Sequence, residues 1–148
     1  MPAAPVPQDV SDFLAEPNIA VVATLNSKGS PHTAATWYDW EDGRVLLSMD
    51  DSRLRLTHLR SDPRIALTVI DTNDWYRHIS LLGQVEEMYG DEGLADIDRL
   101  ARRYTGADYE TRDSPRTTAW VRIDRWHGWD ASRARVTDAS WPATDRAS

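Results

Sequence analysis

Cysteine is absent from the 148-residue sequence. Its absence excludes a disulfide framework, a thiolate metal site and a cysteine nucleophile. Long hydrophobic runs are missing as well, since none approaches the roughly 20 residues that a membrane-spanning helix needs. Residues 1–5 have neither the basic nor the apolar region of a secretory signal. We therefore expect a cytoplasmic protein that does not associate with membranes.

Lysine is nearly absent, because 16 of the 17 basic residues are arginine and Lys28 is the only lysine. Acidic residues outnumber the basic ones, and the formal net charge is −7. This charge argues against nucleic-acid binding, which usually requires a basic face. Arginine is the better residue for planar, bidentate binding of phosphate. The arginine content is therefore compatible with a phosphate ligand, although codon bias explains it equally well.

Familiar catalytic and nucleotide-binding motifs are also missing. The sequence contains no G-x-G-x-x-G, no Walker loop and no G-x-S-x-G elbow. Its four histidines lack the spacing of a zinc site. Adjacent carboxylates such as Glu86 and Glu87 fall where solvated strand ends are expected, so we assign no catalytic residue and no metal site. If the protein is an enzyme, a bound cofactor must supply the reactivity.

Six segments have the composition of β-strands. They are rich in β-branched and aromatic residues and are separated by turn-forming residues. Asp42 and Gly43 form the strongest hairpin signal, and Gly83 is expected to form a bulge. The first three strands are predicted to form a meander, and the fourth to be buried on both faces because its apolar residues barely alternate. The predicted strands span residues 19–25, 32–40, 44–49, 64–71, 75–87 and 119–129.

Short helices are predicted over residues 10–16, 52–60 and 91–104, with Ser52 as the N-cap of the second. Strands and helices do not alternate regularly, so a Rossmann fold is excluded. The pattern predicts a mainly β protein, a closed or nearly closed antiparallel barrel with short inserted helices. Residues 1–130 are expected to form a single domain, and residues 131–148 a loose tail rich in Ala, Ser, Asp and Arg.

The last predicted strand carries four large or charged residues at every second position. Because side chains alternate along a strand, these are expected to share one face. The four residues are Trp120, Arg122, Asp124 and Trp126.

The most informative segment runs from residue 47 to residue 64. A strand that ends in Ser48 and Met49 is followed by a short turn and a helix that opens with Arg53 and Arg55. Backbone N–H groups at a helix start, a hydroxyl and two guanidinium groups together make an anion site. Arg53 and Arg55 diverge on a regular helix, so they converge only if Arg53 lies in an irregular first turn. An ordinary exposed basic helix is the alternative interpretation.

A series of short motifs occurs in order between residue 9 and about residue 130. The motifs lie at residues 17–25, 28–32, 35–38, 53–64, 74–76, 83–86, 102–106 and 120–123. This ordered set resembles the pyridoxamine-phosphate-oxidase-like family of FMN-binding split barrels, and within it the branch that uses the deazaflavin coenzyme F420. The resemblance implies a six- to seven-stranded antiparallel split β-barrel of the FMN-binding type.

The resemblance also implies roles for individual residues. In that family an arginine and a lysine hold the cofactor phosphate, and the matching positions here are Arg53 and Arg55. The second position departs from the family pattern by having arginine, which keeps the charge but puts the details of the phosphate contact in question. Ser48 and Met49 match positions beside the cofactor ring and its linker.

Three aromatic or hydroxyl residues complete the implied cofactor site. Thr36 and Trp37 match the strand that lines the ring pocket, and Trp75 matches an aromatic residue that the second subunit contributes. The resemblance therefore implies a homodimer with the active site at the subunit interface.

Three functions remain open from the sequence. The first is hydride transfer from reduced coenzyme F420 to an electron-poor small-molecule acceptor such as an activated alkene, a quinone or a tetrapyrrole. The second is an FMN-dependent oxidase or reductase of the same fold. The third is a non-enzymatic protein that carries a cofactor or a hydrophobic ligand. Solvent or Tyr38 is considered as the proton donor.

Overall fold

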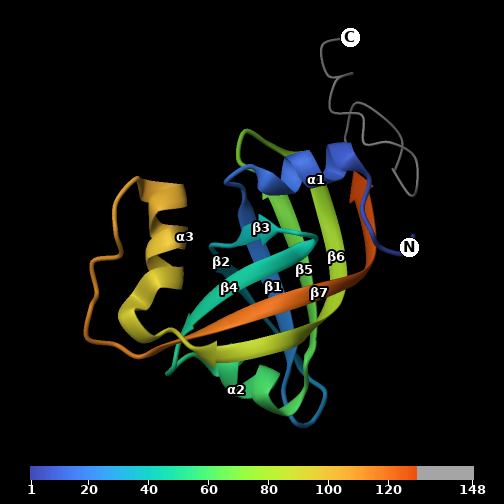
Figure 1. Ribbon diagram of the computed structural model, residues 1–148. Coiled ribbons are helices and arrows are strands. Elements are labelled where there is room, and N and C mark those ends of the chain that lie inside the picture. Colours follow the sequence, from blue (N-terminus) through green and yellow to red (C-terminus); the bar gives the residue numbers. More distant parts are fainter. Residues whose placement is uncertain (130–148) are drawn as a thin grey trace.

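A curved antiparallel sheet of seven strands dominates residues 1–129, the part of the chain that the computed structural model describes (Figure 1). Its strands follow the spatial order β2-β1-β5-β6-β7-β4-β3. The prediction of a mainly β, antiparallel fold is therefore confirmed. The strands are β1 (Ile19–Leu25), β2 (Pro31–Thr36), β3 (Asp39–Glu41), β4 (Arg44–Asp50), β5 (Arg64–Asp71), β6 (Asp74–Gly90) and β7 (Arg116–Trp129).

The sheet is split between its two edge strands, β2 and β3, which are consecutive in the sequence. Only Trp37 and Tyr38 separate them, so the two edges lie close together and the sheet curls into a barrel that is open along this seam. The prediction of one continuous strand over residues 32–40, within a three-strand meander, is wrong. The physical reason is that Tyr38 is fully buried in the barrel core, where its hydroxyl donates to the Leu14 carbonyl at 2.7 Å. Trp37 stacks instead on Tyr104, outside the barrel.

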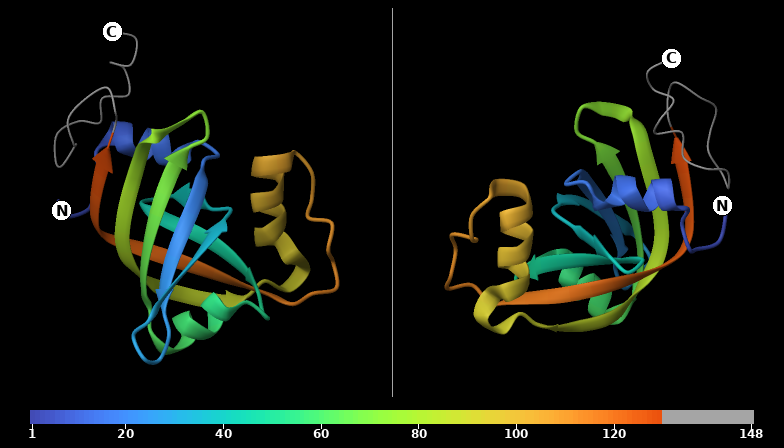
Figure 2. Two further views of the ribbon diagram at one scale, coloured as in Figure 1. Left: turned by 180° about the vertical axis from the view of Figure 1, so that it is seen from behind. Right: turned by 45° about the horizontal axis from the view of Figure 1, so that its top comes forward.

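Two helices close the ends of the barrel, and a third lies outside it. Helix α1 (Gln8–Ala15) covers one end and α2 (Leu54–Ser61) the other (Figure 1). Helix α3 (Ala95–Thr105) stands beside the barrel (Figure 2). It packs on the outer side of β4 and β7 through a small apolar cluster separate from the barrel core, formed by Leu46, Ile97, Leu100 and Trp120.

The helix predicted over residues 91–104 is divided at its start. A 3-10 turn, η1 (Glu92–Leu94), precedes α3. Gly93 and Leu94 have positive φ angles of 79° and 62°, which a continuous right-handed helix does not contain. The helix ends as expected at Gly106, whose φ of 80° suits glycine.

Burial along β5 alternates from residue to residue, so within the single chain only one face of this strand is buried and not both as predicted. Ile65, Leu67 and Val69 face the core, whereas Ala66 and Thr68 face outward and are only partly buried. Side-chain alternation places every second residue on the outer face whatever its polarity. The outer face of β5 is therefore apolar but uncovered within one chain.

The predicted faces of the last strand are also wrong. Trp126 lies in the barrel core, with 1% of its surface exposed, whereas Asp124 is exposed. The cause is a bulge: Leu82 on β6 pairs with Arg125, but the next residue, Gly83, pairs with Ile123, so Asp124 is passed over. One extra residue reverses the facing of all later side chains. The predicted bulge at Gly83 is confirmed.

Within residues 1–129, no helix is both long enough and apolar enough to cross a membrane. The predicted loose tail, residues 131–148, lies outside the described residues.

Candidate functional site

A cavity of about 560 Å³ opens beside the seam of the barrel, between the start of α2, the edge strand β2 and α3. Its lining comes from segments that are far apart in the sequence. Five residues selected from the sequence line it, namely Thr36, Trp37, Ser48, Arg53 and Arg55. The remaining lining residues are Ile19, Ala34, Ala35, Ile97, Leu100, Tyr104, Tyr109 and Arg116.

Arg53 and Arg55 reach the same cavity because α2 begins later than predicted. Arg53 occupies the N-cap position, where its backbone is extended (φ −73°, ψ 135°), so it is not part of the helix. The prediction of Ser52 as N-cap is wrong. Ser52 instead donates to the Asp50 carboxylate, from its backbone N–H at 2.9 Å and from its hydroxyl at 2.6 Å. These bonds hold the pKa of Asp50 below its usual value. The turn thus directs both arginines toward one cavity.

A third arginine, Arg116, enters the cavity from the start of β7. Its Nε donates to the Ser48 hydroxyl oxygen at 3.0 Å, and its guanidinium carbon lies 5.0 Å from the centre of the Tyr109 ring. Arg55 donates from Nη2 to the Thr36 hydroxyl oxygen over a longer distance of 3.4 Å. Two hydroxyl groups therefore orient two of the three guanidinium groups.

Within the described part of the chain the three arginines form no close ion pair, although the charges of Arg116 and Arg53 contribute to the lowered pKa of the Asp50 carboxylate. Among residues 1–129, no carboxylate oxygen lies within 4.0 Å of a side-chain nitrogen of Arg53, Arg55 or Arg116. Burial lowers the pKa of Arg55, and the nearby charges of Arg53 and Arg116 lower it further. Three guanidinium groups that share a partly buried cavity repel one another, and a bound anion relieves this repulsion. The cavity is therefore suited to a phosphate or another oxyanion.

Aromatic rings also line the cavity. The rings of Trp37 and Tyr104 stack in parallel, with centres 5.4 Å apart and planes inclined by 6°. Tyr109 meets Trp37 edge-on, at 6.2 Å and 87°. Ile97 and Leu100 of α3 add apolar surface beside these rings. A flat ring system that bears an anionic side chain therefore matches both the aromatic and the cationic lining of the cavity.

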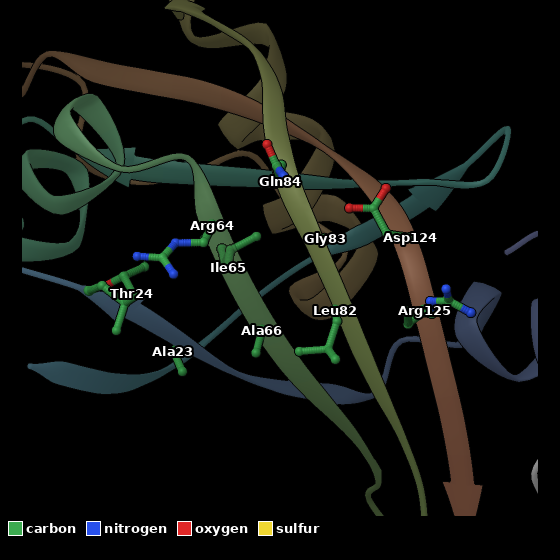
Figure 3. A pocket seen from close by; sticks show the side chains of 11 residues that line it. Ala23, Thr24, Arg64, Ile65, Ala66, Leu82, Gly83, Gln84, Asp124 and Arg125 are labelled. Atoms are coloured by element: carbon green, nitrogen blue, oxygen red, sulfur yellow. The ribbon is translucent and has the colours of Figure 1, made fainter. Parts of the chain in front are cut away.

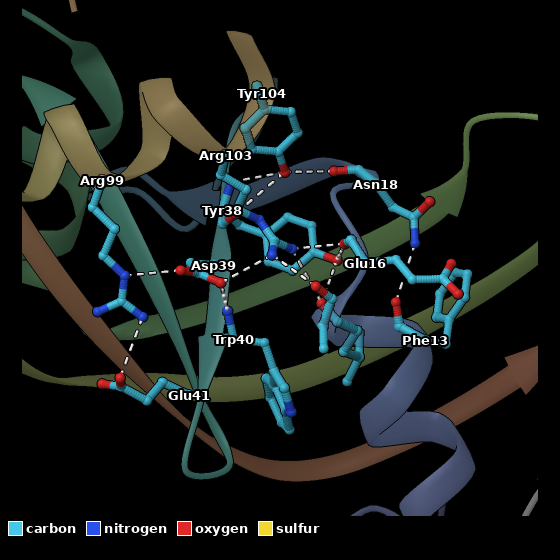
Figure 4. A network of polar contacts seen from close by, with 12 residues as sticks. Phe13, Glu16, Asn18, Tyr38, Asp39, Trp40, Glu41, Arg99, Arg103 and Tyr104 are labelled. Carbon is cyan, nitrogen blue, oxygen red and sulfur yellow. Dashed lines mark hydrogen bonds and ion pairs between the residues drawn. The ribbon is translucent and has the colours of Figure 1, made fainter. Parts of the chain in front are cut away.

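A polar network fixes this aromatic wall to the barrel (Figure 4). The Tyr104 hydroxyl donates to the Asn18 carbonyl at 2.6 Å. Asp39, in the first position of β3, accepts from Arg99 at 2.8 Å and pairs with Arg103 at 3.1 Å. Because Arg99 and Arg103 lie on α3, these contacts hold the helix against the seam. The positions of Trp37 and Tyr104 are thus set by contacts on both sides of the split.

Three candidate residues lie away from this cavity. Met49 is fully buried and faces the barrel core. Trp75 lies near the β5–β6 turn, is 66% exposed, and stacks on Tyr76 with ring centres 4.1 Å apart. The Tyr38 hydroxyl is bonded to main-chain carbonyls in the core, and burial raises its pKa strongly. Tyr38 is therefore unsuited to be the proton donor at this site.

Sequence reasoning missed Tyr104, Tyr109 and Arg116 as cavity residues. Tyr104 belongs to one of the family-like motifs, so its presence was visible but its role was not. Tyr109 and Arg116 flank a polar loop whose course depends on Asp98, which accepts from the Tyr109 N–H at 3.0 Å. No local pattern predicts that contact, because it joins residues on different elements.

A second hollow, of about 430 Å³, lies on the outer face of the sheet and shares no lining residue with the cavity of Arg53, Arg55 and Arg116 (Figure 3). It is lined by β1, β5, β6 and β7, with Ala23, Ala66 and Leu82 at its floor and Arg64 and Arg125 at its rim. Leu82 is 40% exposed. A mainly apolar surface of this kind favours protein–protein contact.

The described residues thus form a seven-stranded antiparallel barrel that is split at one seam, with a cationic and aromatic cavity beside the seam. The profile of the pyridoxamine 5'-phosphate oxidase family matches residues 6–130. The chain therefore belongs to this family, and the resemblance inferred from its motifs is confirmed. The family includes oxidoreductases and proteins that bind flavin-type cofactors.

Solved structures extend the comparison. An F420 reductase is 26% identical to this chain, with a TM-score of 0.75, over 82% of this chain and 98% of the other. A conserved hypothetical protein from Mycobacterium tuberculosis is 22% identical, with a TM-score of 0.67, over 96% of each chain. A heme-binding protein from Mycobacterium smegmatis is 20% identical, with a TM-score of 0.66, over 91% of this chain and 60% of the other. No curated protein matches the chain in sequence.

Proposed function

We propose that this protein binds coenzyme F420 and transfers hydride between it and an electron-poor organic acceptor such as an activated alkene, a quinone or a tetrapyrrole. FMN is the alternative cofactor. The observation that carries the proposal is the cavity itself, which is lined both by three arginines that form no ion pair among residues 1–129 and by the stacked rings of Trp37 and Tyr104. The similarity to an F420 reductase supports the choice of the deazaflavin.

The chain's own residues anchor and orient the cofactor in this proposal. Arg53 and Arg55 bind the phosphate, with Thr36 holding the Arg55 side chain on the cavity wall. Trp37 and Tyr104 form a rigid surface beside the ring, and their fixed positions reduce the entropy lost on binding. The bound cofactor supplies the hydride chemistry. Solvent remains the candidate proton source, since the Tyr38 hydroxyl is engaged in the core.

We also propose that a second copy of this chain covers the outer face of the sheet. The floor of the outer hollow is formed by Ala23, Ala66 and Leu82, small or apolar residues on adjacent strands. Trp75, the most exposed large apolar side chain in the described part of the chain, does not line the cavity of its own chain. A partner subunit that contributes Trp75 to the neighbouring cavity accounts for both features.

The homodimer is tested by light scattering after gel filtration. The wild-type protein is expected at twice the 16.8 kDa chain mass. Ala66→Arg places a charge on the floor of the outer hollow and is expected to give monomers. Trp75→Ala is expected to leave the dimer intact and to weaken cofactor binding, whereas Trp75→Phe keeps most of the binding. A monomeric wild-type protein would refute the dimer and the role of Trp75 in the partner's site.

The cofactor proposal is tested by fluorescence titration of the purified protein with coenzyme F420 and with FMN, side by side. Tighter binding of coenzyme F420 is expected. Arg53→Ala is expected to weaken binding by about 1.5–3 kcal/mol, the value of a charged hydrogen bond. Arg60→Ala is the matched control, because Arg60 is exposed near the end of the same helix and does not line the cavity.

Hydride transfer is then measured as oxidation of the reduced cofactor in the presence of a panel of acceptors. Tighter binding of FMN than of coenzyme F420 would identify FMN as the cofactor. Binding of neither cofactor would overturn the proposal. If the cofactor binds but no acceptor in the panel is reduced, the protein is a cofactor carrier and not an enzyme.

A further inference from the structure

The geometry points to Arg116 as a third ligand of the anion, held in a binding orientation by Ser48 and Tyr109. This inference rests on the proposed function, since it concerns the same cavity. It adds a residue that neither the motifs nor the family resemblance indicated. It also changes the expected role of Ser48, which becomes a residue that positions Arg116.

The contacts of Arg116 leave its terminal nitrogens available. Its Nε donates to the Ser48 hydroxyl oxygen at 3.0 Å, and its guanidinium carbon lies 5.0 Å from the centre of the Tyr109 ring. Within residues 1–129, no carboxylate pairs with it. The guanidinium fork has five N–H donors, and among residues 1–129 only the Nε donor is in a hydrogen bond. Because Arg116 lines the same cavity as Arg53 and Arg55, its remaining N–H donors are available to an anion in that cavity.

The surroundings of Arg116 also differ from those of other arginines on the same molecule. On β7 itself, Arg122 pairs with Asp124 at 2.9 Å, as expected for a solvated surface residue. Arg116 instead lies close enough to Arg55 for the two positive charges to repel each other, and this repulsion contributes to the lowered pKa of Arg55. An arginine placed beside two others, with a hydroxyl and an aromatic ring holding its orientation, is arranged to bind an oxyanion.

Arg116 comes from a different element than the other two arginines. Arg53 and Arg55 belong to the start of α2, whereas Arg116 begins β7, where its backbone lies opposite that of Asp50 at the end of β4. An anion bound by all three would therefore link α2 to the end of the loop that carries Tyr109. Such a ligand is held from two sides, which one helix start alone does not provide.

The test compares Arg116→Gln with Arg122→Gln, a matched change on the same strand. The probes are inorganic pyrophosphate, followed by thermal shift, and coenzyme F420 or FMN, followed by fluorescence titration. We expect Arg116→Gln to weaken the binding of these anions about tenfold or more, as for a lost charged hydrogen bond, and Arg122→Gln to change it less than twofold. Arg116→Lys is expected to give an intermediate affinity, because lysine keeps the charge but not the fork. If Arg116→Gln does not fold, the affinity of Arg116→Lys tests the inference instead, and wild-type affinity in this variant would refute it.

The role of Ser48 is tested by a double-mutant cycle. Ser48→Ala is expected to weaken binding in the wild-type background and to have no further effect in the Arg116→Gln background. Equal effects in both backgrounds would refute the positioning role.

The remaining outcomes separate this inference from the proposed function. If Arg116→Gln binds anions as the wild type does while Arg55→Gln does not, the Arg116 inference fails and the phosphate site stands. If pyrophosphate stabilises the wild type but not Arg116→Gln, and neither cofactor binds, the anion site stands and the proposed function fails.

Discussion

Replacement of Arg55 by methionine should have opposite effects on ligand binding and on stability. Methionine keeps much of the length of the side chain and its apolar contacts but removes the charge. The lost charged contact to the phosphate is expected to cost about 1.5–3 kcal/mol, which is a rise in Kd of about 10- to 150-fold. The bond to Thr36, at 3.4 Å, is long and contributes little to stability.

The effect on stability follows from the pKa of Arg55. Burial and the charges of Arg53 and Arg116 lower this pKa in the folded protein. A lowered pKa of a base means that its charged form is less favourable in the folded than in the unfolded state. Removal of the charge should therefore stabilise the ligand-free protein. Exposed charge pairs are worth about 0.2–1 kcal/mol, so a half-buried like-charge contact should raise the melting temperature by about 1–4 °C.

Two measurements check this prediction, a thermal melt without ligand and a fluorescence titration with the cofactor. Arg60→Met is the control, since Arg60 is exposed on the same helix. It should change neither quantity appreciably. A lower melting temperature of Arg55→Met combined with unchanged affinity would contradict the reasoning, because Arg55 would then be a structural residue and not an anion ligand.

Three further predictions follow from single contacts. A methyl group added by Gly83→Ala would collide with the Arg122 carbonyl oxygen. The free energy of unfolding of this variant, measured by urea denaturation, should therefore be about 1–3 kcal/mol lower than that of the wild type. Trp37→Leu removes one ring of the stacked pair and should weaken cofactor binding by about 1 kcal/mol in the same titration. The hydrogen bond from Arg112 holds the pKa of Asp98 below its usual value of about 3.9. The anchoring of the Tyr109 loop by Asp98 should therefore be complete above pH 4, and should be lost only as the pH falls through the lower folded-state pKa. Hydrogen exchange at the Tyr109 amide measures this loss.

Local sequence patterns predicted some elements well. The strands at Ile19–Leu25 and Arg64–Asp71 have the predicted bounds, because runs of β-branched residues between turn residues are a local signal. The bulge at Gly83 was also predictable, since glycine inside a strand marks a close backbone approach. At Gly83 this approach is to the main chain of β7.

Patterns that depend on non-local pairing were misread. The break at Trp37 and Tyr38 is invisible in a continuous β-rich run, because it depends on the packing of Tyr38 against α1 and of Trp37 against α3. The face predicted for Trp126 is wrong because the bulge opposite Gly83 inserts one extra residue into β7. Local alternation along a single strand cannot show such an insertion.

The sequence by itself determined the family, the antiparallel barrel and the pair of arginines at the start of the second helix, because these depend on residue order and on short-range periodicity. Only the tertiary structure decided that Arg53 and Arg55 converge, that Arg116 joins them, and that Trp37 and Tyr104 form one wall. Each of these depends on where separate elements meet, and chain folding brings together residues whose proximity no local pattern encodes.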